Sequence, residues 1–270
     1  MFDDFYEVVL ADNSACRAIH YRIRFHVYCV ERGYEDPAAF PSGQERDAWD
    51  DDAVHFVVRE RQSGRCVAAM RLVLPRAVDF PVERLGCLWP TEANRLRRRK
   101  CGEISRICVI RSPASWMYHN PLAPGLGHVP KGREFEVLLG MLRAIWAHGL
   151  GRGIEHCYLI VTEPFARLLR RFGVALRPVG DPFAHRGTRT PYVVDLRESG
   201  RLMCRRSPAV HALFARETLA WRRGSAIDPD AIDPDSLLIG SDGPGGPLSR
   251  QGARATYETV SQTVRSGEGK

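Results

Sequence analysis

Carboxylate and arginine side chains recur at close spacing in the N-terminal half of this chain, beside apolar segments. In sequence order they are Arg24, Glu45, Asp47, Asp50, Arg71, Glu103 and Arg106, and Ser105 precedes the last of them. Charged side chains are costly to bury alone, so charged groups of both signs within apolar surroundings predict a paired constellation. A constellation of this kind indicates a functional site.

Three carboxylates within six residues are also what a divalent metal ion would need. The neighbouring arginines argue against a metal, because they would satisfy the same oxygens. The eight cysteines are scattered with no CxxC pair, which argues against a zinc site and a disulfide framework. The histidines show no metal-ligand spacing, and no Ser/His/Asp or Cys/His pairing supports a covalent mechanism. We expect no metal and reduced thiols.

The elements that position these residues can be predicted from hydrophobic spacing. Asn13 is a helix cap, and a helix to about Glu31 would place Arg24 and Tyr28 on one face. Its apolar stripe comprises Ile19, Ile23, Val27 and Val30. Gly33 ends the helix, and residues 33–53 form a long loop of the kind that carries function.

Further along the chain the pattern favours a sheet with helices on it. The predicted strands are 55–60, 66–74, 104–110, 157–161 and 192–196, and the predicted helices are 135–148 and 162–171. Gln62-Ser63-Gly64 joins the first two strands as a hairpin. Strict alternation in the third strand would place one set of residues on one face, Glu103, Ser105, Ile107 and Val109, and the other set on the opposite face, Ile104, Arg106 and Cys108. This order predicts an α+β domain with a mixed, mostly antiparallel sheet flanked by helices.

We expect one domain over residues 1–204, a C-terminal helix over 205–223 and a disordered tail over 224–270. Residues 112–132 are rich in Pro and Gly and indicate a mobile excursion. No apolar run is long enough to cross a membrane, and the N-terminus lacks a secretory pattern. A cytoplasmic protein is the expectation.

The net charge of +7 is unevenly distributed along the 270 residues. Residues 225–270 contain four basic and seven acidic side chains, so the remainder of the chain carries +10. Basic residues concentrate in two patches, which comprise Arg97, Arg98, Arg99 and Lys100, and Arg167, Arg170 and Arg171. Such patches attract a polyanion, which leaves nucleic acid, an anionic bilayer and an acidic protein as alternatives to a solvated face.

Taken in order, ten residues resemble the signature of the acyl-homoserine-lactone (autoinducer) synthases. They are Arg24, Tyr28, Tyr34, Glu45, Asp47, Asp50, Arg71, Glu103, Ser105 and Arg106. The family pattern reads R-x-x-x-F, an aromatic, E-x-D-x-x-D, a strand Arg and E-[IL]-S-R; Tyr34 stands where Trp is usual. The stretches 27–31 and 186–192 are closer to a sister group, the PEP-CTERM/exosortase-associated acyltransferases, which are related to N-acyl amino acid synthases.

The resemblance implies a GNAT-like acyltransferase fold and transfer of a fatty acyl group from a carrier thioester to an amine. The amine must lose a proton, which a nearby carboxylate can accept directly or through water. The tetrahedral oxyanion needs donors, such as backbone N–H groups at a splayed strand. The acyl chain needs an apolar slot.

The resemblance also suggests roles for the residues. Glu103 is the candidate general base, unless an ion pair with an arginine is its whole role. Ser105 orients a water or substrate, or makes a plain strand hydrogen bond, and Arg106 pairs with Asp47 or Asp50. The remaining candidates for substrate binding are Arg24, Tyr28, Tyr34, Glu45, Asp47, Asp50 and Arg71. The three loop carboxylates would hold the acceptor amine or fix Arg24 and Arg71 in place, and the alternative is a solvated acidic loop. For the two tyrosines, the alternative to substrate binding is packing in the core.

The donor is an acyl carrier protein or acyl-coenzyme A, and no resident cofactor is expected. Residues 125–133 do not fit the [RQ]-x-x-G-x-[GA] loop with which GNAT enzymes bind a pyrophosphate, so a small acidic carrier protein is favoured. The two basic patches would dock it.

Three alternatives remain. The first is a lactone-forming synthase that uses S-adenosylmethionine. The second is a basic binding module without catalysis, and the third is a non-catalytic partner that binds a carrier protein. Peripheral membrane contact stays open, whereas the absence of any nucleic-acid-binding motif argues against nucleic acid.

Overall fold

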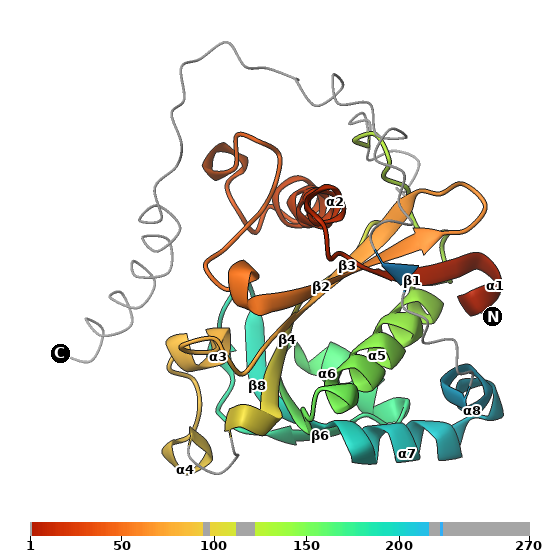
Figure 1. Cartoon of the computed structure of the whole chain (residues 1–270). Coiled ribbons are helices and arrows are strands. Elements are labelled where there is room, and N and C mark those ends of the chain that lie inside the picture. Colours follow the sequence, from red (N-terminus) through yellow and green to blue (C-terminus); the bar gives the residue numbers. More distant parts are fainter. Residues whose placement is uncertain (1, 94–97, 112–121, 216–221, 224–270) are drawn as a thin grey trace.

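A computed structural model describes residues 2–93, 98–111, 122–215 and 222–223 (Figure 1). These residues form a nine-stranded sheet in the order β6-β8-β5-β4-β3-β2-β1-β9, with β7 paired to β8. The strands are β1 (Tyr6–Leu10), β2 (Ala53–Glu60), β3 (Cys66–Val73), β4 (Cys101–Val109), β5 (His156–Val161), β6 (Ala175–Pro178), β7 (Phe183–Ala184), β8 (Thr188–Asp195) and β9 (Arg222–Arg223). The β4–β5 and β1–β9 pairs are parallel and the others antiparallel. The predicted α+β class with a mixed, mostly antiparallel sheet is confirmed.

Helices cover both faces of this sheet (Figure 1). They are α1 (Phe2–Phe5), α2 (Ser14–Phe25), α3 (Pro81–Arg84), α4 (Pro90–Ala93), α5 (Glu134–Gly151), α6 (Glu163–Arg171), α7 (Leu196–Arg206) and α8 (Pro208–Ala215). Helix α2 lies on one face of the sheet, called here the network face because the charged side chains meet there. The loop around α3 covers another part of the same face. Helices α5 to α8 bury the main apolar core against the opposite face, called the core face.

The predicted helix from Asn13 is present, with the Asn13 side chain accepting a hydrogen bond from the Cys16 N–H at 2.8 Å. It continues from α2 into a π-helix over His26–Glu31. The π-turns bond i to i+5, as the Arg32 N–H bonds the Val27 carbonyl at 3.0 Å. Consequently the predicted stripe is buried as far as Val27, whereas Val30 is only partly buried.

Strands β4 and β5 separate partway along their length. Their register pairs run from Cys101 with His156 to Glu103 with Tyr158 and then stop. Beyond Glu103, β4 still pairs with β3 but no longer with β5, while β5 continues beside β8. A gap therefore opens in the middle of the sheet directly after Glu103.

A β-bulge interrupts β4 beside this gap. The register with β3 shifts between Ala69 and Arg71, and Arg106 has a left-handed backbone with φ of 53°. The extra residue reverses the alternation, so the predicted assignment of faces is wrong beyond Ser105. Arg106 shares the network face with Ser105, whereas Ile107 packs against the core on the other side.

Several elements were not predicted from the sequence. Strand β1 is the main one, and it pairs with β2 over its whole length. The region 205–223 contains the end of α7, then α8 and the short β9, and the tail 224–270 lies outside the described residues. In the segment 112–132, residues 122–132 are described, and Leu126 and Val129 are buried there.

Candidate functional site

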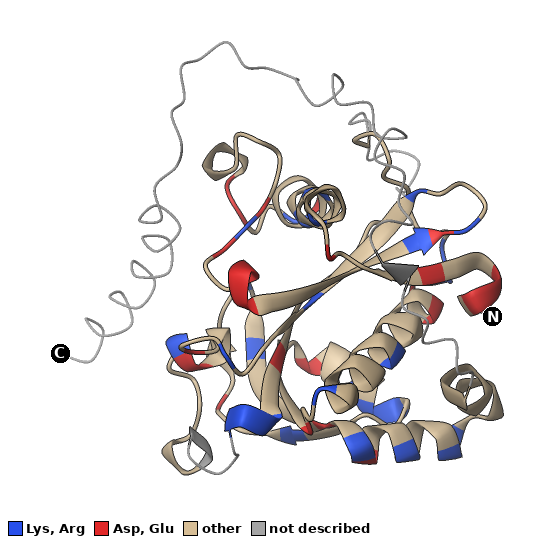
Figure 2. Cartoon of the chain, viewed as in Figure 1, with Lys and Arg blue, Asp and Glu red and all other residues tan. Residues whose placement is uncertain are grey.

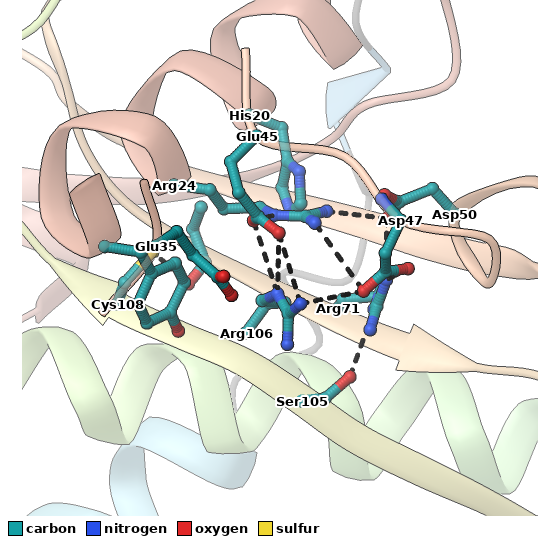
Figure 3. Close-up of polar contacts among 12 residues, drawn as sticks. His20, Arg24, Glu35, Glu45, Asp47, Asp50, Arg71, Ser105, Arg106 and Cys108 are labelled. Atoms are coloured by element: carbon teal, nitrogen blue, oxygen red, sulfur yellow. Dashed lines mark hydrogen bonds and ion pairs between the residues drawn. The ribbon is translucent and has the colours of Figure 1, made fainter. Parts of the chain in front are cut away.

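Three arginines and three carboxylates meet on the network face, where α2, the loop after it, β3 and β4 converge (Figure 3). Arg24, from α2, is fully buried. Its Nε donates to Glu45 Oε2 at 2.5 Å and its Nη1 to Asp50 Oδ1 at 2.6 Å. The helix is thereby tied to both ends of the acidic loop segment.

The strands supply the other two arginines. Arg71 of β3 donates from Nη1 to Asp47 and to Asp50 Oδ1, the latter at 2.9 Å, and from Nε to Ser105 Oγ at 3.0 Å. Arg106 pairs with Glu45 at 3.1 Å and with Asp47 at 2.9 Å. The bulge brings Arg106 to this face, where it makes the predicted pair with Asp47 and a further pair with Glu45.

The six charges compensate one another. Burial disfavours the charged form of Glu45, but Arg106 and Arg24 outweigh it and lower the pKa of its carboxyl to about 2. For Asp50 burial acts in the same way, and Arg24 with Arg71 brings its pKa well below the usual range. Glu45 and Asp50 are therefore interpreted as ionised at neutral pH, and the network orders the loop between α2 and β2.

Sequence reasoning missed three side chains that support this network. His20 and His55 stack edge-on with ring centroids 4.6 Å apart, and their Nε2 atoms bond the carbonyls of Met70 and Asp50 at 3.2 and 3.0 Å. Burial lowers the pKa of His55 to about 4, so both rings are neutral near pH 7. Trp49 donates from Nε1 to the Asp79 carbonyl at 3.0 Å. The position of Trp49 inside the acidic motif was the available signal.

Glu103 lies on the same face but outside the network. It is 2% exposed, and among the described residues it forms no ion pair. Its Oε2 accepts a hydrogen bond from the Val82 N–H at 2.8 Å. Burial raises the pKa of its carboxyl to about 8, although the Val82 N–H and Arg71 oppose this. An unpaired carboxyl at the head of the gap, with a pKa near neutrality, suits proton transfer.

The raised pKa of Glu103 predicts a pH dependence of stability. Folded Glu103 binds its proton up to about pH 8, whereas the unfolded carboxyl loses it near pH 4.5. Its stabilising contribution is therefore complete below pH 4.5 and is lost as the pH rises to 8. Between pH 5 and 8, the free energy of unfolding of the native chain should fall relative to that of Glu103→Gln by roughly 2–4 kcal/mol. Urea unfolding of both proteins at several pH values measures this, and parallel curves would contradict it.

Tyr28 and Tyr34 lie beside Arg106. The Tyr28 hydroxyl donates to the Ile107 carbonyl at 3.3 Å, at the bulge. The two rings stack with centroids 6.4 Å apart, and the Arg106 guanidinium lies 5.6 Å from the Tyr28 centroid. Tyr28 packs inside, whereas Tyr34 is 36% exposed and forms part of the surface of the site.

An apolar cavity of about 30 Å³ lies on the core face of the gap. Ile104 and Ile107 of β4 face Leu159 of β5 across it, at the positions where the two strands no longer pair. Helices α5, α6, α7 and α8 supply most of its remaining walls, and Val194 of β8 and Val174 complete them. The gap thus has a charged network on one face and an apolar cavity on the other.

The basic patches have mixed environments, and around α3 the ribbon carries both basic and acidic residues (Figure 2). Arg97 lies outside the described residues. Arg98 binds Glu83 at 2.5 Å and lies over the Phe80 ring, and Lys100 pairs with Glu155 at 2.8 Å. Arg170 pairs with Glu163 at 3.3 Å. The exposed members are Arg99, Arg167 and Arg171.

In the described part of the chain, no helix combines the length and apolarity needed to span a bilayer. Within the same residues, no group of His, Cys, Asp and Glu side chains has an arrangement that would hold a metal ion.

Residues 23–113 match the family model of the GNAT acetyltransferase domain. No curated protein matches the chain. Among solved structures, a CoA-dependent acyl-homoserine lactone synthase, BjaI, with SAM and isopentyl-CoA is 18% identical with a TM-score of 0.55, and the match covers 93% of this chain and 98% of BjaI.

Two further structures are similar. TofI in a ternary complex with an inhibitor and MTA is 20% identical with a TM-score of 0.54, over 76% of this chain and 99% of TofI. The AHL synthase LasI is 14% identical with a TM-score of 0.51, over 71% of this chain and 90% of LasI. Together with the splayed β4 and β5, these matches show that the chain has the GNAT acyltransferase fold.

Proposed function

We propose that the chain is an N-acyltransferase that moves a fatty acyl group from a carrier thioester to the amine of an amino acid or a similar small molecule. The observation that carries the proposal is the gap after Glu103, with an apolar cavity on one face and polar groups on the other. The apolar lining of the cavity suits an acyl chain, which would have to widen the 30 Å³ space on entering it. The gap suits the thioester, and the network face suits the amine.

The chemistry follows from the positions of these groups. The amine nitrogen attacks the thioester carbonyl carbon, a C–N bond forms, and the C–S bond breaks with departure of the thiol. Glu103 accepts the amine proton, directly or through water, and the same proton then passes through water to the thiolate, which departs as the thiol. The Ser105 hydroxyl accepts a hydrogen bond from Arg71 and so keeps its own hydrogen to orient a water or substrate. Backbone N–H groups of β4 that no longer bond β5 would stabilise the oxyanion.

Arg24, Arg71 and Arg106 are already paired with Glu45, Asp47 and Asp50. We assign these six residues to holding the acceptor side of the site in shape, because a closed network fixes its members. Tyr34 is exposed at the rim and is the aromatic in this group that can contact the acceptor, while Tyr28 supports it.

An acyl carrier protein is our proposed donor, with acyl-coenzyme A as the alternative. The first turn of α5 contains Glu134 and Glu136, and Glu134 accepts a hydrogen bond from the Gly132 N–H at 2.8 Å. Carboxylates at a helix N-terminus oppose the binding of a pyrophosphate there. This supports a donor bound through surface charge.

The exposed arginines of α6 provide a test of docking. Reversing charge with Arg167→Glu and Arg171→Glu together should raise KM for acyl carrier protein about 10-fold while leaving KM for the same acyl-coenzyme A unchanged. The native KM for the carrier protein should also rise with salt. A matched double reversal at Arg17 and Arg46, on the other side of the sheet, is the control. An equal rise in KM for acyl carrier protein and for acyl-coenzyme A would reject Arg167 and Arg171 as part of the docking surface.

A lactone synthase that uses S-adenosylmethionine is the second candidate. It is favoured by the likeness to BjaI and TofI and by the ordered motif from Arg24 to Arg106. The stretch from Arg186 to Tyr192 instead supports the PEP-CTERM-associated acyltransferases, so we rank N-acyl amine formation first.

Mass spectrometry of extracts from cells that express the chain distinguishes these functions. A new N-acyl amine, absent from cells with empty vector and with Glu103→Gln, is expected. An acyl lactone, formed by purified protein only when S-adenosylmethionine is supplied, would select the second candidate. No new acylated product in either experiment would reject both and favour a non-catalytic binding module.

A further inference from the structure

The segment after the π-helix reaches across the network face to the β7–β8 hairpin. Glu35, in this segment, forms an ion pair with Arg186 in the hairpin turn, and both side chains are mostly buried. The turn is tight, with Arg186 at φ 52° and Gly187 at φ 93°. The contact joins two parts of the chain that are 151 residues apart.

Two stacked tyrosine rings between two arginines continue this contact toward β4. Arg106 lies 5.6 Å from the Tyr28 centroid, Tyr28 stacks on Tyr34, and the Arg189 guanidinium lies 5.9 Å from the Tyr34 centroid. In the sheet β5 lies between β4 and β8. The row from Arg106 to Arg189 therefore extends from one side of the gap to the strand beyond it.

Arg189 stands at the open end of the gap. Thr190 is in register with Val161, the last residue of β5, so Arg189 is one residue past the end of that strand. It shares the network face with Val193, because Tyr192 and Val194 pack on the core face. Arg189 is partly buried, which places its guanidinium at the rim rather than in bulk solvent.

The hydrogen-bonding groups of Arg189 are mostly unused. Its Nε donates to the His185 carbonyl at 2.8 Å, which fixes the plane of the guanidinium. Among the described residues, neither Nη atom has a hydrogen-bond partner and no carboxylate pairs with Arg189. This differs from Arg24, Arg71, Arg106 and Arg186, each of which has an acidic partner.

Of the three arginines along this row and its hairpin, Arg106, Arg186 and Arg189, only Arg189 has no acidic partner among the described residues. Glu35 is neutralised by Arg186, and Arg106 is compensated within the network. Burial, reinforced by Arg189 and Arg106, lowers the pKa of the nearby His185 to about 4, so this imidazole is neutral near pH 7. The two free Nη groups form a fork whose geometry matches the two oxygens of a carboxylate or phosphate.

We propose that Arg189 binds an oxyanion of the acceptor, so that the acceptor is an amine carrying a carboxylate or a phosphate, positioned over the Tyr34 ring. The inference rests on the proposed function and names its acceptor class. The proposal also explains the ion pair between Glu35 and Arg186, which holds Tyr34 and the β7–β8 hairpin together at the edge of the site.

Pairs of acceptors that differ in whether they carry an anionic group test whether Arg189 binds an oxyanion. Purified protein with carrier-bound acyl chains of several lengths is given free α-amino acids, their carboxamides, O-phosphoethanolamine and ethanolamine. The native protein should use the anionic member of a pair with kcat/KM about 10–100-fold higher, because a charged hydrogen bond is made only by that member. Comparing amino acids with O-phosphoethanolamine distinguishes carboxylate from phosphate.

Substitutions of Arg189 then test whether this residue causes the preference for anionic acceptors. Arg189→Gln should reduce the anionic-to-neutral ratio toward 1 by raising KM for the anion, with kcat for the neutral acceptor retained, and Arg189→Lys should restore part of it. Arg17→Gln, an exposed arginine on α2, is the matched control and should leave the ratio unchanged.

The outcomes separate this inference from the proposed function. Equal use of acids and carboxamides by the native protein would overturn the role of Arg189 while leaving acyl transfer intact, and this comparison needs no variant to fold. An equal loss of kcat/KM for both acceptors in Arg189→Gln would also overturn it. Transfer to no amine at all would reject the proposed function, and this inference with it.

Discussion

Glu103→Gln should lower kcat for acyl transfer by about 10²–10⁴-fold, the range typical for loss of a general base. The amide has nearly the same shape and can accept the Val82 N–H bond that now reaches Oε2 at 2.8 Å, so the fold should be retained. What is lost is the acceptor for the amine proton. Steady-state kinetics with the native donor measure the effect.

The pH profile makes this prediction specific. With the pKa of Glu103 raised to about 8 by burial, the base form accumulates as the pH rises. Native kcat/KM should therefore increase up to about pH 8 and then level off, while the residual rate of Glu103→Gln should lack this step. The control is Glu60→Gln, at the hairpin end of β2, which should behave like the native enzyme. Glu103→Gln activity within threefold of native would place the base elsewhere.

Asp50→Asn should destabilise the protein by about 3–5 kcal/mol, the cost of removing one partner from a buried ion pair. Asp50 Oδ1 accepts from Arg24 at 2.6 Å and from Arg71 at 2.9 Å, and both arginines are fully buried. Without the carboxylate, two guanidinium groups share two remaining acids with Arg106. Urea denaturation gives the change in the free energy of unfolding.

An exposed pair provides the contrast. Asp52 lies two residues further and pairs with Arg76 at 3.2 Å, but its side chain is 41% exposed. Asp52→Asn should therefore cost less than about 1 kcal/mol. If Asp50→Asn and Asp52→Asn had the same free energy of unfolding, the charge network would not be what orders the loop between α2 and β2.

Neutralising two opposite charges together should lower the free energy of unfolding by less than the sum of the two single substitutions. In Arg24→Met with Glu45→Gln, the remaining cluster keeps two arginines and two carboxylates, so its net charge is unchanged. We expect a coupling energy of about 1–3 kcal/mol in this cycle. Strict additivity would indicate that the two residues act independently, contrary to their 2.5 Å contact.

The sequence predicted the main secondary-structure elements and the meeting of the charged residues. Helix spacing after Asn13, the hairpin at residues 62–64 and the strand at Glu103 are local signals, and each is present in the structure. Arginines and acids at apolar positions could be expected to pair, because an isolated buried charge is costly. The missed strand β1 is short, and its pairing with β2 depends on contacts 52 residues away.

Tertiary structure decided which residues belong to which part of the site. Alternation cannot locate a bulge, since the extra residue is accommodated by neighbours on β3, and only the folded chain shows Arg106 beside Ser105. The separation of Glu103 from the network, and so its raised pKa, depends on the cover that residues 80–82 provide. The free fork of Arg189 likewise follows from its place past the end of β5. Burial and charge partners come from distant segments, and for that reason the list of charged residues did not distinguish the base from the network.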